Sequence, residues 1–306
     1  MTTVPSAPQG SLLMKSATYA AVTVALILVA IKIWAWFMTG SVAMLGSLVD
    51  SSLDVMVSAV NLAAVHAAVT PADREHRFGH GKAEAIAGLL QGLVISASAL
   101  FLIVRSVQRI ITPEPIQQST IGIAVMVVSI VLTLGLVAYQ RYVINHSRSL
   151  AIKAESLHYA SDLLMNLGVI VALVVTGLFG IPYVDPVIAI IIAAVLLNGA
   201  WHIAVQSFDM VMDKEFPEED RQKIKDLVLA HREVMAMHDL RTRSSGTMSF
   251  IQFHIELDPE ISLVESHKIS DEVEASVAEK FPHAEILIHQ DPYGIPEERV
   301  EFPKAG

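Results

Sequence analysis

The sequence contains no cysteine among its 306 residues. Disulfide bonds and thiolate metal ligands are therefore excluded, and any soft-metal chemistry must come from histidine and carboxylate side chains. An HExxH motif, in which two helical histidines bind zinc beside a glutamate base, is also missing. Its absence argues against an intramembrane metalloprotease, the enzyme class that a metal site in an apolar chain would otherwise suggest.

Charged side chains are absent from five long runs. Four of the runs reach the ~20 residues that a helix needs to cross a bilayer. The first continues past Lys32 to about residue 38, since a lysine can extend its ammonium toward an interface. An apolar stretch over residues 41–69 adds a sixth span. We therefore expect an all-α membrane domain of six helices over residues 11–212. The charge-free runs are residues 17–31, 85–104, 119–140, 163–184 and 186–208.

Charge is concentrated in the last third of the chain. Residues 1–212 carry 10 Lys and Arg against 10 Asp and Glu, whereas residues 213–306 carry 11 against 21, which accounts for the net charge of −10. We predict a separate acidic domain over residues 213–294, and disordered tails at the two ends of the chain, residues 1–10 and 295–306. An acidic surface argues against nucleic-acid binding and suits the recruitment of cations.

The acidic domain has the pattern of an α+β fold in the order α-β-β-α-β. Apolar and polar residues alternate with a period of two in the second predicted strand, and Ser262 with Glu265 forms a capping box before the second helix. The predicted elements are a helix over 217–231, strands over 237–243 and 248–257, a helix over 262–281 and a strand over 285–290.

Basic residues in the short loops predict the orientation in the membrane. Seven lie in the segments on one side, and two lie near the opposite side. This asymmetry places both termini and the acidic domain in the cytoplasm. The seven are Lys15, Arg74, Arg77, Lys82, Arg141, Arg148 and Lys153, and the two are Arg105 and Arg109.

Two apolar spans carry ionisable pairs at the same spacing. Asp50 and Asp54 lie four residues apart in the second span, and His158 and Asp162 lie four residues apart in the fifth. Residues at i and i+4 share a helix face, so two such helices offer four nitrogen and oxygen ligands, the number and type that Zn²⁺ prefers. Polar residues lining a helix interface are the simpler alternative. The matched pairs favour a metal site.

The charge of this site predicts a mechanism. Three ionised aspartates would give the empty site a charge of −3 in a medium of low dielectric, so protons and metal compete for the ligands. Alternate opening to the two sides of the membrane then gives metal/proton antiport. A metal-gated channel is the competing interpretation, and the proton dependence of the flux separates the two.

Two further groups of residues could bind metal. Asp73, His76 and His80 follow the second span at spacings that fit a bent loop, although solvated loops often carry such residues without a ligand. In the acidic domain, His238 and His254 lie on neighbouring predicted strands, with His267 on the second helix and His289 and Asp291 in the final HQD sequence. Adjacent strands would bring these side chains together. The remaining histidines are interpreted as structural or surface residues; they are His66, His146, His202, His231 and His283.

These motifs together resemble the cation diffusion facilitator family, in particular its bacterial zinc transporters. The resemblance rests on DxxxD, HxxxD, "FGHGK" after the second span, "HDLRTRSSG" and the final "IHQDP", and it covers nearly the whole chain. It implies a homodimeric Zn²⁺/H⁺ antiporter of the bacterial inner membrane, exporting metal from the cytoplasm, with a metallochaperone-like cytoplasmic domain.

The resemblance also implies roles for individual residues. Asp50, Asp54, His158 and Asp162 would form the transport site, and Asp73, His76 and His80 a loop site. In the cytoplasmic domain, His238, His254 and Asp291 would bind one ion, with His267, His289 and the shared Asp291 binding a second. Lys82 and Asp213 would interlock the two domains, and Leu157 would act as a hydrophobic gate. One imidazole among three carboxylates suits Zn²⁺ and leaves Cd²⁺, Fe²⁺, Co²⁺ and Ni²⁺ open, while arguing against Mn²⁺.

Overall fold

The computed structural model describes residues 8–40, 42–112, 120–147, 149–179 and 183–295. The chain divides into two compact units. The membrane unit consists mainly of Ser6–Met212, and the C-terminal unit consists of Asp213–Ser244 with Met248–Gly306. Most of the two expected disordered tails, residues 1–10 and 295–306, lies outside the described residues, although the first helix already begins at Pro8.

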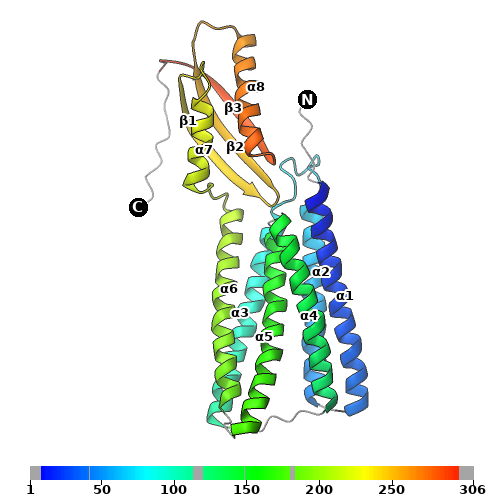
Figure 1. Cartoon of the computed structure of the whole chain (residues 1–306). Coiled ribbons are helices and arrows are strands. Elements are labelled where there is room, and N and C mark those ends of the chain that lie inside the picture. The colour runs from blue at the N-terminus through cyan, green and yellow to red at the C-terminus, as the bar shows by residue number, and fades with distance from the viewer. Residues whose placement is uncertain (1–7, 41, 113–119, 148, 180–182, 296–306) are drawn as a thin grey trace. The chain divides into compact units, whose positions relative to one another are not determined.

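The described part of the membrane unit contains six long helices (Figure 1). By length and composition, all of them except α5 are long and apolar enough to cross a membrane. The first half of α5 carries Lys153, Glu155, His158 and Asp162, which interrupt its apolar character. The helices are α1 (Pro8–Thr39), α2 (Val42–Ala68), α3 (Ala83–Ile111), α4 (Thr120–Ser147), α5 (Leu150–Phe179) and α6 (Val184–Val211).

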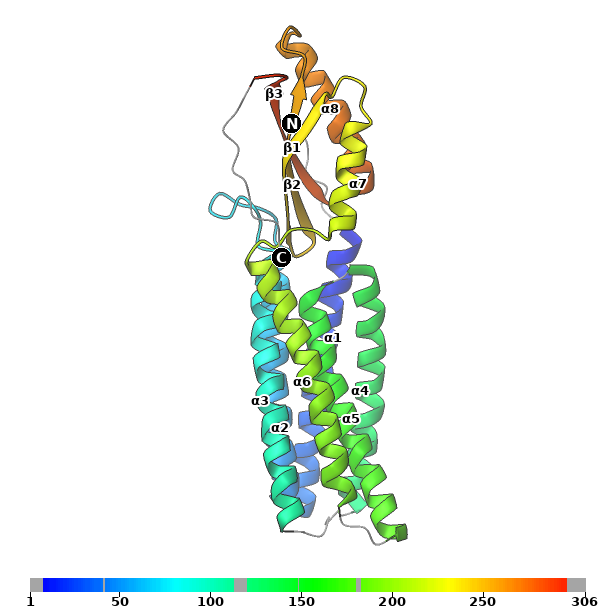
Figure 2. The ribbon, with the colours of Figure 1, turned by 90° about the vertical axis from the view of Figure 1, so that its left-hand side faces the viewer.

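Within this bundle, α3 lies along α6, and α2 lies beside α1 (Figures 1 and 2). Small residues bring α3 and α6 close together: a Cβ on Gly88 would lie 2.3 Å from Ser207 Oγ, and a Cβ on Gly92 would lie 3.4 Å from the Ala200 carbonyl oxygen. Close packing of small residues is how apolar helices associate in lipid, where apolar surface alone gives no driving force. Helix α5 packs against both α4 and α6.

A buried carboxylate fixes the start of α5. Glu84, in the first turn of α3, is 1% exposed. It accepts hydrogen bonds from the Ser149 hydroxyl at 3.0 Å and from the backbone N–H of Leu150 at 3.1 Å. The first N–H groups of a helix have no partner within the helix, so Glu84 caps α5 from a neighbouring element.

The C-terminal unit confirms the predicted small α/β domain and its element order. It contains α7 (Glu218–Leu229), β1 (Ala236–Ser245), β2 (Met248–Leu257), α8 (Leu263–Lys280) and β3 (Ala284–Pro292). Ser262 caps α8 as predicted, its side chain accepting from the Glu265 N–H at 3.2 Å. The described strands form one sheet in the order β1-β2-β3.

The pattern of burial along β2 gives the sheet two different faces. Ile251, Phe253, Ile255 and Leu257 are buried against α7 and α8, and they form the core of this unit. His254 and Glu256 lie between them in sequence and therefore face the other side. Strand β3 runs parallel to β2. The polar face of the sheet is thus the surface on which the predicted metal ligands of β2 and β3 lie.

Candidate metal sites

The first candidate site lies between α2 and α5, which carry the two ionisable pairs. Nε2 of His158 is 3.0 Å from Oδ1 of Asp54 and 4.0 Å from Oδ2 of Asp162. Ligand atoms of these three residues all lie within 4.8 Å of one another. Tetrahedral zinc ligands stand ~3.3 Å apart for metal–ligand bonds of about 2.0–2.1 Å, so small side-chain movements would suffice to bind an ion.

Asp50 lies outside this group. It is exposed and sits one turn before Asp54 on α2, and its carboxylate is not among the three clustered ligands. The sequence spacing placed both aspartates on one face of α2, but it did not determine which of them reaches α5. Leu157, next to His158, is half-buried and packs against Gly199 of α6, where an added Cβ would lie 2.7 Å from the leucine side chain.

A lysine near this site was missed by the sequence interpretation. Lys32 of α1 donates to Ser51 Oγ at 2.6 Å and to the Ser47 carbonyl oxygen at 3.2 Å, both on α2. Its charge interacts with those of Asp54, Asp162 and Asp50. The ammonium therefore points into the protein and not toward the interface. The sequence could have indicated this contact. Because α1 and α2 are consecutive antiparallel helices, positions 32 and 51 lie at a similar depth in the membrane.

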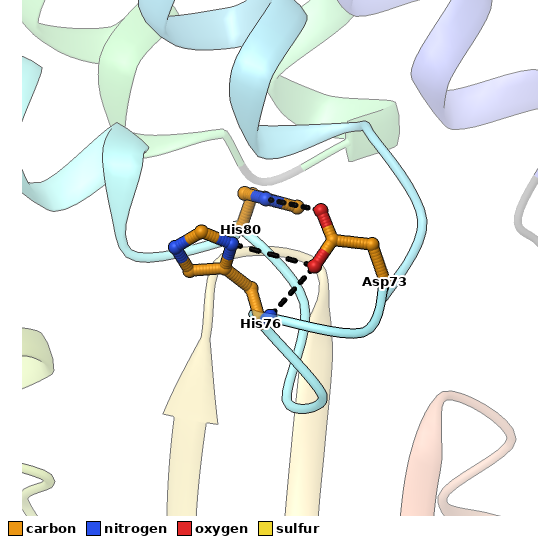
Figure 3. Close-up of side chains that lie close together, drawn as sticks. All are labelled: Asp73, His76 and His80. Atoms are coloured by element: carbon orange, nitrogen blue, oxygen red, sulfur yellow. Dashed lines mark hydrogen bonds and ion pairs between the residues drawn. The ribbon is translucent and has the colours of Figure 1, made fainter.

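The loop between α2 and α3 brings Asp73, His76 and His80 together (Figure 3). Nδ1 of His76 is 3.4 Å from Oδ1 of Asp73, and Nε2 of His80 is 3.4 Å from Oδ2. The Asp73 carboxylate also accepts from the backbone N–H groups of His76 and Glu75. These hydrogen bonds, that of His76 first, lower the pKa of Asp73 below its ordinary value. Two imidazoles thus converge on an ionised carboxylate that the loop backbone holds in place.

The third candidate site centres on Asp291 of β3, which is only 5% exposed. Its Oδ2 lies 2.8 Å from Nδ1 of His254 and 3.3 Å from Nε2 of His238, whereas its Oδ1 lies 3.1 Å from Nε2 of His289. The parallel register explains the cluster, because it pairs position 254 with 289 and position 256 with 291. One carboxylate therefore presents each of its oxygens to a different set of imidazoles.

His267 does not join this cluster. Its side chain is 73% exposed on α8 and lies 3.8 Å from Asp271. Two carboxylates that the sequence interpretation omitted lie beside the cluster. Asp239 is 3.4 Å and Glu256 is 3.6 Å from ring nitrogens of His238. The alternation of β2 could have indicated Glu256, since it shares the polar face with His254.

The two predicted interlock residues each have a partner within their own unit. Lys82 donates to the Val211 carbonyl oxygen at 3.3 Å, and Asp213 accepts from Arg243 at 3.4 Å. Both residues take part in further interactions. Their pairing with each other would connect the two units, and it stays a prediction.

Two protein-family models match the sequence of this chain. Residues 18–212 match the family described as cation efflux transmembrane domain, and residues 216–293 match the cytoplasmic domain of cation efflux proteins. The chain belongs to the cation efflux family. The predicted resemblance is thereby confirmed, and the protein is a multi-pass membrane transporter of divalent metal cations.

Relatives match along most of the chain. The cation-efflux pump FieF of Cronobacter sakazakii is 43% identical over 283 residues, which are 92% of this chain and 94% of the relative. FieF of Yersinia enterocolitica is 42% identical over 293 residues, 95% of this chain and 97% of the relative. A solved structure, the metal-bound C-terminal domain of the CzcD transporter from Thermotoga maritima, is 25% identical and covers 26% of this chain and 93% of its own, with a TM-score of 0.24. The match to the cytoplasmic dimer domain implies that this transporter dimerises.

Proposed function

We propose that this protein exports Zn²⁺ from the bacterial cytoplasm across the inner membrane in exchange for protons. The proposal rests on the contact of His158 with Asp54 and Asp162 between two apolar helices. Asp50 would complete the set from one turn away on α2. The loop distribution of lysine and arginine supports cytoplasmic termini.

The chemistry of the ligands supports exchange with protons. Nε2 of His158 is the atom that would bind the metal, and without metal it lies at hydrogen-bond distance from Asp54. Zinc binding therefore requires that this hydrogen bond break and that the ligands be deprotonated. A helix movement that opens the site to the opposite side would release zinc and let protons replace it. With Asp50 as the fourth ligand, no position would be left open for the activated water that a hydrolase needs.

The cytoplasmic cluster supports a regulatory role. Asp291 would bridge two zinc ions, one held with His238 and His254 and the other with His289, since its two oxygens lie beside different imidazoles. His267 would have to move to contribute to the second ion. Zinc bound here would tie β1, β2 and β3 together and so stabilise the dimerising domain. Asp291→Asn should then abolish the zinc-dependent increase in dimer stability. His231→Gln, which alters a histidine bonded to Glu272, should leave that increase intact.

The transport proposal is tested with the full-length protein in vesicles that contain a zinc-sensitive dye. Zinc flux is measured with and without an imposed pH gradient for wild type, Asp54→Ala and His158→Ala. His202→Ala, an exposed histidine on α6, is the control for loss of an imidazole.

Flux that follows the proton gradient, persists in the control and disappears in both site variants would support antiport. Zinc flux that ignores the gradient would overturn antiport in favour of a channel. Flux of Cd²⁺ or Fe²⁺ in place of zinc would overturn the choice of metal and leave the site in place.

A further inference from the structure

A second polar cluster lies inside the membrane unit, one helical turn from the metal ligands. It contains Ser58 and Asn61 from α2, Gln140 from α4, and Glu155 and Tyr159 from α5. Each of these side chains is at most 1% exposed. Neither the metal site nor the helix cap at Ser149 uses any of them, so their burial needs a separate explanation.

The hydrogen bonds within this cluster leave several buried polar atoms without a partner. Nε2 of Gln140 donates to Oε2 of Glu155 at 3.1 Å. The Tyr159 hydroxyl donates to the Ala21 carbonyl oxygen at 3.3 Å, so the Ser58 hydroxyl, 2.8 Å away, donates to Tyr159. Ser58 also approaches the Glu155 carboxyl, but its single proton can serve only one of these two acceptors at a time. Four buried atoms of the cluster remain without a hydrogen bond: Oε1 of Glu155, Oε1 of Gln140, and both Oδ1 and Nδ2 of Asn61.

An ionised Glu155 would fit this environment poorly. A carboxylate removed from water costs several kcal/mol unless a cation and several donors compensate it. Among the described residues, no Lys or Arg is ion-paired with Glu155. The ionisable groups that interact with it are His158 and Tyr159 on its own helix, whereas α2 contributes the neutral Ser58 and Asn61 and α4 the neutral Gln140.

A proton on Oε1 of Glu155 resolves both problems at once. The carboxylic acid is neutral, and its O–H can donate to Oε1 of Gln140 while Nε2 of Gln140 donates to Oε2. Acid and amide then form a doubly hydrogen-bonded pair, which satisfies two of the four unpaired atoms. The amide of Asn61 also approaches the Glu155 carboxyl. It can donate a hydrogen bond to the Glu155–Gln140 pair or accept one from it.

We propose that Glu155 is a proton-binding site of this transporter, separate from the metal ligands. The proposal rests on the antiport function proposed above and adds a proton carrier to it. Glu155 lies on α5 and interacts with Ser58 and Asn61 of α2. These two helices also carry the proposed metal ligands. A relative movement of α2 and α5 therefore changes the burial of Glu155 together with the opening of the metal site. On exposure to water the acid releases one proton and becomes a carboxylate, and reburial requires that a proton be taken up again.

The proton can be observed without any transport. Infrared spectra of the zinc-free protein should contain the carbonyl stretch of a protonated carboxylic acid that shifts in D₂O. Glu155→Gln, which preserves the shape and forms an amide–amide pair with Gln140, should lack this band. Gln140→Leu should keep the band at a shifted frequency, because the acid has lost its partner. Identical spectra for wild type and Glu155→Gln would overturn the proposal. A band that disappears on addition of NaCl at constant pH would also overturn it, because sodium and not a proton would then be bound at Glu155.

Transport measurements then test the coupling. In vesicles with a pH dye and a zinc dye, Glu155→Gln should move about one proton fewer per zinc than wild type. An unchanged ratio would overturn the role of Glu155 in exchange. If wild type itself shows no proton movement with zinc, the proposed antiport fails. If the wild-type spectrum contains no band that Glu155→Gln removes, only the Glu155 site is overturned.

Discussion

Nε2 of His158 lies 3.0 Å from Oδ1 of Asp54, although 104 positions separate the two residues in the chain. The contact joins α5 to α2, and each helix carries a further carboxylate four residues from the contacting residue, Asp162 on α5 and Asp50 on α2. The imidazole and the carboxylate satisfy each other's hydrogen-bonding capacity. If these residues bind zinc as proposed above, metal binding replaces an existing bond, and the measured affinity is the difference between the two states.

The first prediction concerns this pair. Asp54→Asn and His158→Gln should each lower zinc affinity at the transport site by at least the 10–100-fold that loss of an outer-shell partner costs. The double variant should be no weaker than the worse single variant, since a site that has lost one of its ligands no longer acts as a unit. The zinc dependence of flux into vesicles measures this. Additive effects would show that the two residues act independently.

The second prediction concerns Lys32. Its ammonium is held by Ser51 and repels a divalent ion at the neighbouring carboxylates. Lys32→Met should therefore increase zinc affinity, on the order of tenfold for charges several ångströms apart at intermediate dielectric, and should slow zinc release. Transport assays should show a lower KM and a lower maximal rate. Lys32→Arg keeps the charge and should stay close to wild type; weaker zinc binding in Lys32→Met would contradict this account.

The third prediction is a pH dependence at the loop site. Backbone N–H groups lower the pKa of Asp73, so its carboxylate stays ionised as the pH falls, until the pH reaches the lowered value. Above that lowered value, protons therefore do not compete with zinc for this carboxylate. Above that pH, Asp73→Asn should weaken zinc binding and leave the slope of log affinity against pH unchanged. Zinc titrations at several pH values measure the slopes, and a flatter slope for Asp73→Asn would be inconsistent with an ionised carboxylate.

The fourth prediction concerns the cap on α5. Glu84→Gln places an amide nitrogen opposite the Ser149 hydroxyl or the Leu150 N–H, and one donor is then left without an acceptor. A buried unsatisfied group costs about 1–3 kcal/mol, so the thermal unfolding midpoint should fall by several degrees. Glu75→Gln makes the same substitution at an exposed loop position and serves as the control. Equal midpoints for the two variants would show that Glu84 does not stabilise α5.

The periodicity of apolar and polar residues in the sequence predicted the fold and some of the residues of the candidate sites. The i, i+4 spacing predicted the two ligand pairs, and the alternation in β2 predicted that His254 lies on the polar face. Asp291 gathers His238, His254 and His289 because parallel pairing aligns β2 with β3. That register depends on packing between segments far apart in sequence, which spacing along one segment does not contain.

Other features depended on rotations that the sequence does not specify. Asp50 and His267 have suitable chemistry, but the rotation of α2 and the placement of α8 leave them outside the clusters. Glu155 was the reverse case. Glu155, His158 and Asp162 repeat every three to four residues on α5, as Asp54, Ser58 and Asn61 do on α2, so both stripes could have been recognised as facing polar surfaces.

The cap formed by Glu84 gives α5 the geometry of a lever. The helix is held at Leu150, and His158 lies about 12 Å along its axis from that point, whereas Phe179 lies about 44 Å away. A tilt of about 10° around the fixed end would move the imidazole by only about 2 Å but the far end by about 8 Å. A small rearrangement at the metal ligands is thereby amplified roughly fourfold at the opposite end of the bundle.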